Sequence, residues 1–151
     1  MTALTTNLFA QDTGAVWLRN IDTLEFKILY NKKAIPTELL KYIEVNKLNE
    51  IANLDEKFIS GCVGSSSIPH TRVNWVAKDK KNHYAVSISF GGYAHKTRFY
   101  YLDNDKKKIN INELFFGNSY TLTTGLTFGS TTKKINNGEF QFFEWDPPVD
   151  K

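Results

Sequence analysis

The feature that most constrains this chain is a strict alternation of side chains over residues 83–90. The apolar positions are Tyr84, Val86, Ile88 and Phe90, and His83, Ala85, Ser87 and Ser89 stand between them. A repeat of two residues is typical of a β-strand with one buried face. Comparable short segments, separated by turn residues, predict strands at 71–78, 83–90, 96–102, 119–128 and 139–145. We therefore expect the second half of the chain to form an antiparallel meander of about five strands.

The first half of the chain mixes strand and helix patterns. Segments 15–21 and 23–30 are predicted strands, and Pro36 fits the first turn of a helix that is followed by a second helical stretch over 48–58. Segment 112–117 is predicted to form a single capped helical turn. The expected fold is α+β, with the meander packed on a helical pair and two further N-terminal strands. The predicted core is Leu24, Phe26, Ile28, Leu39, Ile43, Ile51, Val86, Ile88, Phe90, Phe99, Leu122 and Phe128.

A chain of 151 residues has the usual size of one domain, so we expect a single domain over 1–151 with residues 1–14 as a loosely attached arm. Cys62 is the only cysteine, which favours a reducing, cytoplasmic compartment. No apolar run reaches the ~20 residues of a membrane span, so a soluble protein is expected. The first residues lack the basic and hydrophobic regions of a signal peptide, and a leader removed upstream is the alternative.

The positive charge of the chain is concentrated in the predicted meander. Residues 61–138 contain eleven basic and four acidic side chains, a net charge of +7, whereas the whole chain carries +3. Hairpin connections return alternate turns to the same end of a sheet, so the lysine-bearing turns are expected to lie together. The predicted partner-binding lysines are Lys80, Lys81, Lys106, Lys107, Lys108, Lys133 and Lys134. Solubility of an edge-rich β-protein is the competing explanation for these lysines.

The opposite end of the predicted meander is the one place where a nucleophile and a base could meet. Cys62, His70 and His95 fall in loops that should gather there, which gives a small hydrolase as an alternative function. The sequence has no phosphate-binding loop and no zinc spacing, and lysines follow Asp103-Asn104-Asp105 where a calcium loop needs oxygen ligands. No cofactor and no metal are therefore expected.

These observations favour a non-enzymatic protein-binding module, of the inhibitor or immunity type, that covers an acidic surface of its partner. A nucleic-acid- or glycan-binding module is a further alternative, although lysine outnumbers arginine nine to two in residues 61–138. The strand at 139–145 is rich in aromatic residues on both faces. It is expected to be covered by the chain itself, by a second copy or by a partner.

Overall fold

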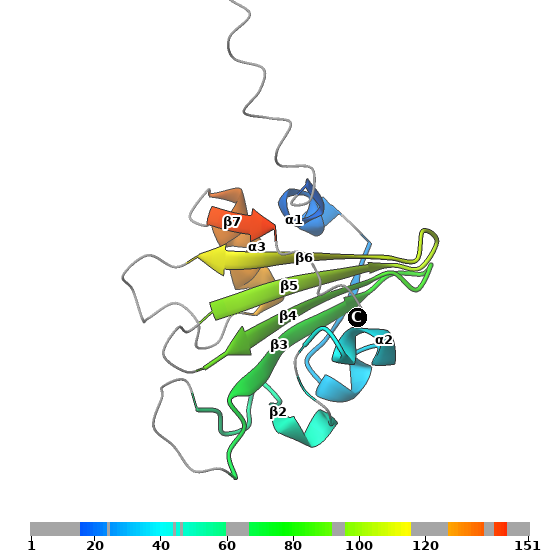
Figure 1. The fold of residues 1–151 in the computed structure, drawn as a ribbon. Coiled ribbons are helices and arrows are strands. Elements are labelled where there is room, and N and C mark those ends of the chain that lie inside the picture. The colour runs from blue at the N-terminus through cyan, green and yellow to red at the C-terminus, as the bar shows by residue number, and fades with distance from the viewer. Residues whose placement is uncertain are drawn as a thin grey trace, which may run out of the picture.

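A computed structural model describes residues 16–23, 25–43, 45, 47–59, 67–91, 96–115, 127–137 and 141–144. Its centre is a seven-stranded sheet in the order β1-β3-β4-β5-β6-β7, with β2 paired to β3 beside β1 (Figure 1). The strands are β1 (Lys27–Leu29), β2 (Ile51–Ala52), β3 (Thr71–Lys78), β4 (Tyr84–Phe90), β5 (Lys96–Asp103), β6 (Lys108–Phe115) and β7 (Gln141–Glu144). All pairs are antiparallel except β2 with β3, so the expected antiparallel α+β architecture is confirmed in outline.

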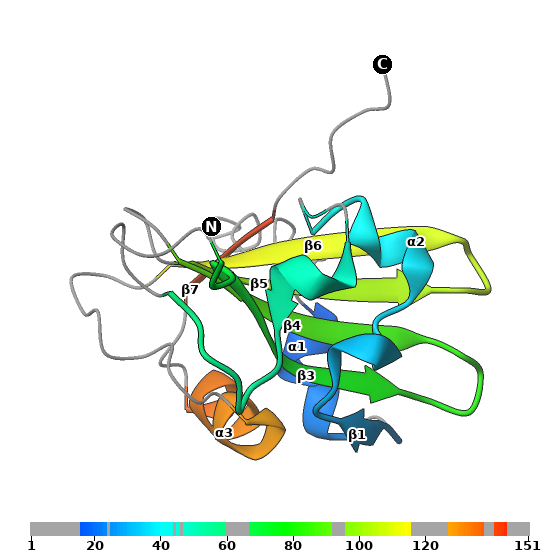
Figure 2. The same cartoon turned by 90° about the horizontal axis from the view of Figure 1, so that it is seen from below.

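The helices are short and lie on both faces of the sheet (Figures 1 and 2). They are α1 (Val16–Arg19), α2 (Thr37–Leu40) and α3 (Phe128–Asn136), with 3-10 turns η2 (Ile21–Thr23), η3 (Lys32–Ala34) and η4 (Leu48–Glu50). Pro36 is the N-cap of α2, close to its predicted place at the helix start. No helix in the described ranges is long and apolar enough to cross a membrane.

One face of the sheet packs against α2 and the residues around it. A single apolar row crosses five neighbouring strands, formed by Leu29, Val76, Val86, Tyr100 and Ile111 in direct register. Ile35, Leu39 and Ile43 cover this row and complete the first core cluster. The period-two pattern therefore predicts the core here because each strand contributes alternate residues to the same face.

The other face packs against α1, η2 and α3. Leu18, Ile21 and Ile135 join Trp75 and Phe99 in the second core cluster. The strands carry small residues on this face, Ala77 and Ala85, which lie opposite each other in the register. Small side chains at these positions leave room for the helical segments that pack on this face.

Most of the expected core is confirmed. Seven of the predicted residues are buried: Leu39, Ile43, Ile51, Val86, Ile88, Phe90 and Phe99. Phe26, Ile28 and Phe128 are half-buried and pack against the second cluster. Leu24 and Leu122 lie outside the residues whose side chains are described, as does the predicted arm at 1–14.

Three predicted elements in the first half of the chain are wrong in extent or type. Segment 15–21 contains α1 and the start of η2 in place of a strand, because Leu18 and Ile21 reach the same core from one side of a helical turn. Among the described residues of 23–30, the strand is limited to Lys27–Leu29 of β1. The expected helix at 48–58 is replaced by η4 and β2, because Ile51 and Ala52 pair in parallel with Thr71 and Arg72.

Two predictions in the second half are also corrected. Segment 112–117 was expected to be helical, yet residues up to Phe115 belong to β6, which pairs with β5 from Asp103 opposite Lys108 onward. The predicted strand at 119–128 ends in a helix: the Thr127 side chain accepts a hydrogen bond from the Ser130 amide, 3.2 Å away, and α3 begins at Phe128. Residues 119–126 lie outside the described ranges.

Candidate binding site at the hairpin turns

The lysine-bearing turns of two hairpins lie at the same end of the sheet, called here the turn end. It contains residues 79–83, between β3 and β4, and residues 104–107, between β5 and β6 (Figure 1). Lys80, Lys81, Lys106, Lys107 and Lys108 are all exposed there. The structure therefore brings together five of the seven lysines that the sequence singled out.

Lys133 and Lys134 do not belong to the turn end. The sequence placed them in a connecting loop, but they lie in the last turn of α3. Both views show α3 away from the two hairpin turns along the strand direction (Figures 1 and 2). Cations near a helix C-terminus interact favourably with the helix dipole, which gives these two lysines a local structural role.

Aspartate side chains shape both turns from within. Asp79 Oδ1 accepts hydrogen bonds from the backbone amides of Lys81 and His83, each at 2.8 Å. Asp103 Oδ1 accepts from the amides of Asp105 and Lys106, at 3.0 and 3.1 Å. These contacts satisfy amides that a tight turn leaves without strand partners.

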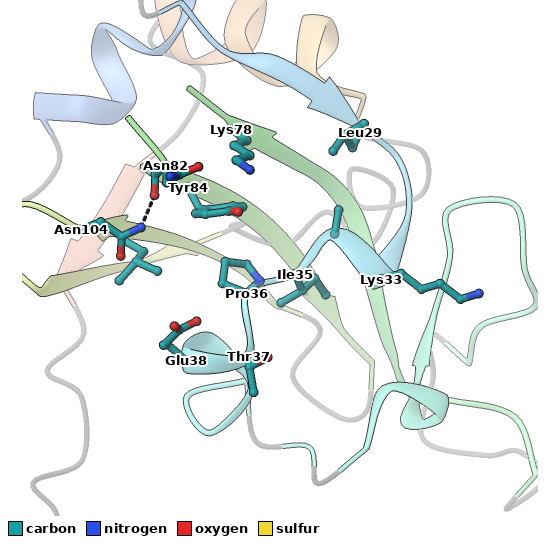
Figure 3. Close-up of a pocket in the computed structure, with 12 residues that line it drawn as sticks. Leu29, Lys33, Ile35, Pro36, Thr37, Glu38, Lys78, Asn82, Tyr84 and Asn104 are labelled. Atoms are coloured by element: carbon teal, nitrogen blue, oxygen red, sulfur yellow. Dashed lines mark hydrogen bonds between the residues drawn. The ribbon is translucent and has the colours of Figure 1, made fainter. Parts of the chain in front are cut away.

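Each turn contains one residue with left-handed backbone, and a hydrogen bond joins the two turns. Asn82 has φ 61° and Lys107 has φ 49°. Asparagine adopts this region more readily than other non-glycine residues, whereas lysine does so at a cost. The side-chain amide of Asn104 donates to the carbonyl oxygen of Asn82, so the two turns are joined directly (Figure 3).

An acidic cluster around one histidine lies among these lysines. His83 Nδ1 is 2.9 Å from Asp79 Oδ2, and His83 Nε2 is 3.2 Å from Asp105 Oδ2 and 3.4 Å from Asp103 Oδ1. Burial raises the pKa of the nearby Tyr101 phenol above its usual value, and the negative charges of Asp103, Asp79 and Asp105 raise it further. From the sequence, Asp103 and Asp105 were considered as the start of a calcium loop and were not paired with His83. Only the strand register brings the two turns together.

A groove opens beside the turn end, on the face of the sheet that carries α2 (Figure 3). Its volume is about 600 Å³. The apolar part of its lining includes Ile35, Pro36 and Leu102, and Lys33 and Lys78 add positive charge. No sequence pattern pointed to this groove, because its walls come from segments that only the fold brings together.

A second hollow of about 440 Å³ adjoins the groove. The two share Glu38, Leu102 and Asn104 in their linings, and the second extends to Lys107 and Ile109. Together they connect the surface beside α2 to the lysine-bearing turn between β5 and β6. We call the two hollows together the docking groove.

The alternative nucleophile site of Cys62, His70 and His95 stays a prediction, because Cys62 and His95 lie outside the described ranges. His70 is exposed just before β3, and its carbonyl oxygen accepts a hydrogen bond from the Gly91 amide at 2.7 Å. The contact is a backbone one and gives the imidazole of His70 no catalytic partner.

A buried polar strip crosses β3, β4 and β5, and it includes Ser87 and Ser89, which the alternation over 83–90 placed opposite the apolar positions. The Asn74 side-chain amide donates to Ser87 Oγ at 3.0 Å and Ser89 Oγ at 2.9 Å, and Ser89 Oγ lies 3.3 Å from Thr97 Oγ1. All four residues are 0% exposed. Hydroxyls buried to this degree stabilise the sheet only while their partners are present, so the strip is a structural element and not a contact surface.

Replacing Asn74 with alanine should lower the free energy of unfolding by about 1–3 kcal/mol, because buried hydroxyls would be left without their donor. Urea denaturation measures this loss. The triple variant Asn74→Ala, Ser87→Ala, Ser89→Ala should lose less than the sum of its single substitutions, since it removes both partners of the Asn74–Ser87 and Asn74–Ser89 hydrogen bonds. Strict additivity would show that the strip does not act as a network.

The chain was compared with protein-family models, with curated proteins and with solved structures, and none of the three comparisons gave a match.

Proposed function

We propose that this protein is a non-enzymatic binding module that holds an acidic segment of a partner protein in the docking groove and against the lysines of the turn end. The observation that carries the proposal is the adjacency of a partly apolar groove to exposed lysines from two hairpins. An inhibitor or immunity-type protein acts by occupying a surface in this way and needs no chemistry of its own.

The charges at the turn end support an acidic partner. Lys80 forms a long contact with Glu25, 3.9 Å, but both side chains are about nine-tenths exposed, so the pair is worth little in water. Exposed ammonium groups in two adjacent turns create a positive potential that raises association rates with a negatively charged partner.

The groove supports a protein partner over a purely ionic one. Apolar walls from Ile35, Pro36 and Leu102 can bury a hydrophobic side chain of the bound segment. Lys78 Nζ lies 5.4 Å from the centre of the Tyr84 ring, a cation–π contact that holds this ammonium beside the groove. A segment that alternates acidic and apolar residues would satisfy both features.

Reversing charge at Lys80, Lys81, Lys107 and Lys108 together should slow association with a short peptide rich in glutamate and leucine about tenfold or more, and flatten the salt dependence. Stopped-flow fluorescence at two salt concentrations measures both effects. The matched control reverses Lys47, Lys57, Lys133 and Lys134, which gives the same net charge away from the turn end.

Equal slowing in the two variants would show that only net charge matters and would overturn the proposed site. Tighter binding of a single-stranded oligonucleotide than of the acidic peptide would favour the nucleic-acid alternative. Circular dichroism checks that both variants remain folded.

The prediction of a homo-oligomer through 139–145 stays a prediction: β7 lies at one edge of the sheet, and its side chains are outside the description.

A further inference from the structure

The arrangement around His83 fixes the direction of its imidazole. Asp79 Oδ2 lies 2.9 Å from Nδ1, the length of a charge-assisted hydrogen bond, so Nδ1 carries a proton that it donates to Asp79. In the neutral ring Nε2 then presents a lone pair toward Asp103 and Asp105. A carboxylate that orients a histidine through its far nitrogen is the usual outer partner of a metal-binding histidine.

The distances on the Nε2 side are compatible with a shared metal ion. Nε2 is 3.2 Å from Asp105 Oδ2, the length of a long hydrogen bond, and 3.4 Å from Asp103 Oδ1. Ligands at ~2.0–2.1 Å from a tetrahedral zinc ion are separated by roughly 3.3–3.4 Å, which is close to the spacing of Nε2 from each of these two oxygens. The three ligand atoms all lie within 4.8 Å of one another.

We propose that His83 Nε2 and one carboxylate oxygen each from Asp103 and Asp105 bind a divalent transition metal such as Zn²⁺, with Asp79 as the outer hydrogen-bond partner of the histidine. A water molecule completes the tetrahedron. Zinc accepts a donor set of one nitrogen and two oxygens. Calcium and magnesium prefer oxygen ligands alone, so this set favours zinc over them.

The position of this site gives it a role that differs from the docking groove. His83 and Asp79 come from the turn after β3, and Asp103 and Asp105 from the turn after β5, so one ion would clamp the two hairpins to each other. The exposed ammonium groups of Lys80, Lys81 and Lys106 oppose the ion, but they extend into solvent, where their repulsion is screened. The ion would also neutralise carboxylates that lie among the lysines of the turn end.

Titration calorimetry of the metal-free protein with ZnCl₂ tests the site. One zinc ion per chain is expected, with binding lost in His83→Gln and in Asp105→Asn, and weakened about 10- to 100-fold in Asp79→Asn. Asp105 is exposed, so Asp105→Asn should leave the fold intact. It therefore tests the site even if His83→Gln disturbs folding. A triple control variant, His70→Gln, His95→Gln and Cys62→Ser, removes the other two histidines and the only thiol while leaving this site unchanged.

If zinc binding persisted in both the His83→Gln and the Asp105→Asn variants, the proposal would be overturned. The absence of stoichiometric zinc binding by the folded wild type would overturn it as well. Calcium that binds as tightly as zinc would overturn the role of the histidine nitrogen. The calorimetry tests the zinc site independently of the acidic-peptide experiment, because it uses the metal alone.

Discussion

Trp75→Ala is expected to lower the free energy of unfolding by about 3–5 kcal/mol. Trp75 is completely buried and contacts Phe99 and Phe128, with ring centres 6.0 and 5.1 Å apart. Its indole nitrogen donates to Thr131 Oγ1 at 3.3 Å, so the side chain joins β3 to α3 by packing and by a hydrogen bond. Alanine would leave a cavity between the sheet and α3 and a buried hydroxyl without its donor.

Denaturation by urea, followed by circular dichroism, measures the effect of Trp75→Ala. The control is Tyr30→Ala, because Tyr30 is an aromatic residue that is 47% exposed and its loss should change stability by no more than about 0.5 kcal/mol. A loss no larger than that of the control would mean that α3 does not pack on this face of the sheet.

Ile88→Ala is expected to cost about 2–5 kcal/mol for a different part of the core. Ile88 is fully buried in the cluster beneath α2, opposite Val73 and Arg98 in the sheet register. Its side chain and that of Trp75 point to opposite faces of the sheet. The effects of the two substitutions should therefore add to within about 0.3–0.5 kcal/mol in the double variant.

The same urea experiment, applied to the single and double variants, tests that independence. A near-neutral Ile88→Ala would contradict the register of β4. A strong deviation from additivity would show that the two clusters form one unit through the sheet.

The strands that sequence patterns predict well are those in which one face is apolar and the other is small or polar. In β4 the alternation is complete, and β3 and β5 follow closely because their apolar residues share its register. The sequence could not show that Ser87 and Ser89 are buried, because a hydroxyl inside the fold and one in water look the same in a period-two pattern.

The elements that were missed depend on contacts with distant residues. In β6 Asn110 and Asn112 are usual turn residues, yet pairing with β5 holds them in a strand. In α3 the glycine, serine and threonine residues over 129–132 have low helix propensity, but the Thr127 cap and the burial of Thr131 and Ile135 select the helix. Tertiary packing overrides local preference at both places.

The candidate site was predictable in part. The lysines of adjacent hairpin turns followed from meander connectivity, whereas Lys133 and Lys134 did not, because the connection that carries them is a helix. The cluster around His83 could have been found from register: once β4 pairs with β5, Tyr84 lies opposite Leu102 and His83 is brought beside Asp103.

The outer edge of β3 also bears on how this protein avoids aggregation. β2 pairs with the first two residues of β3 and β1 with its last three, and on the inner side the register of β3 with β4 shifts between Val73 and Trp75, which bends the strand. A strand from another molecule would meet two short segments of opposite direction and a local irregularity in place of a long regular edge. The divided covering of β3 thus protects the most buried strand of the described sheet from edge-to-edge association.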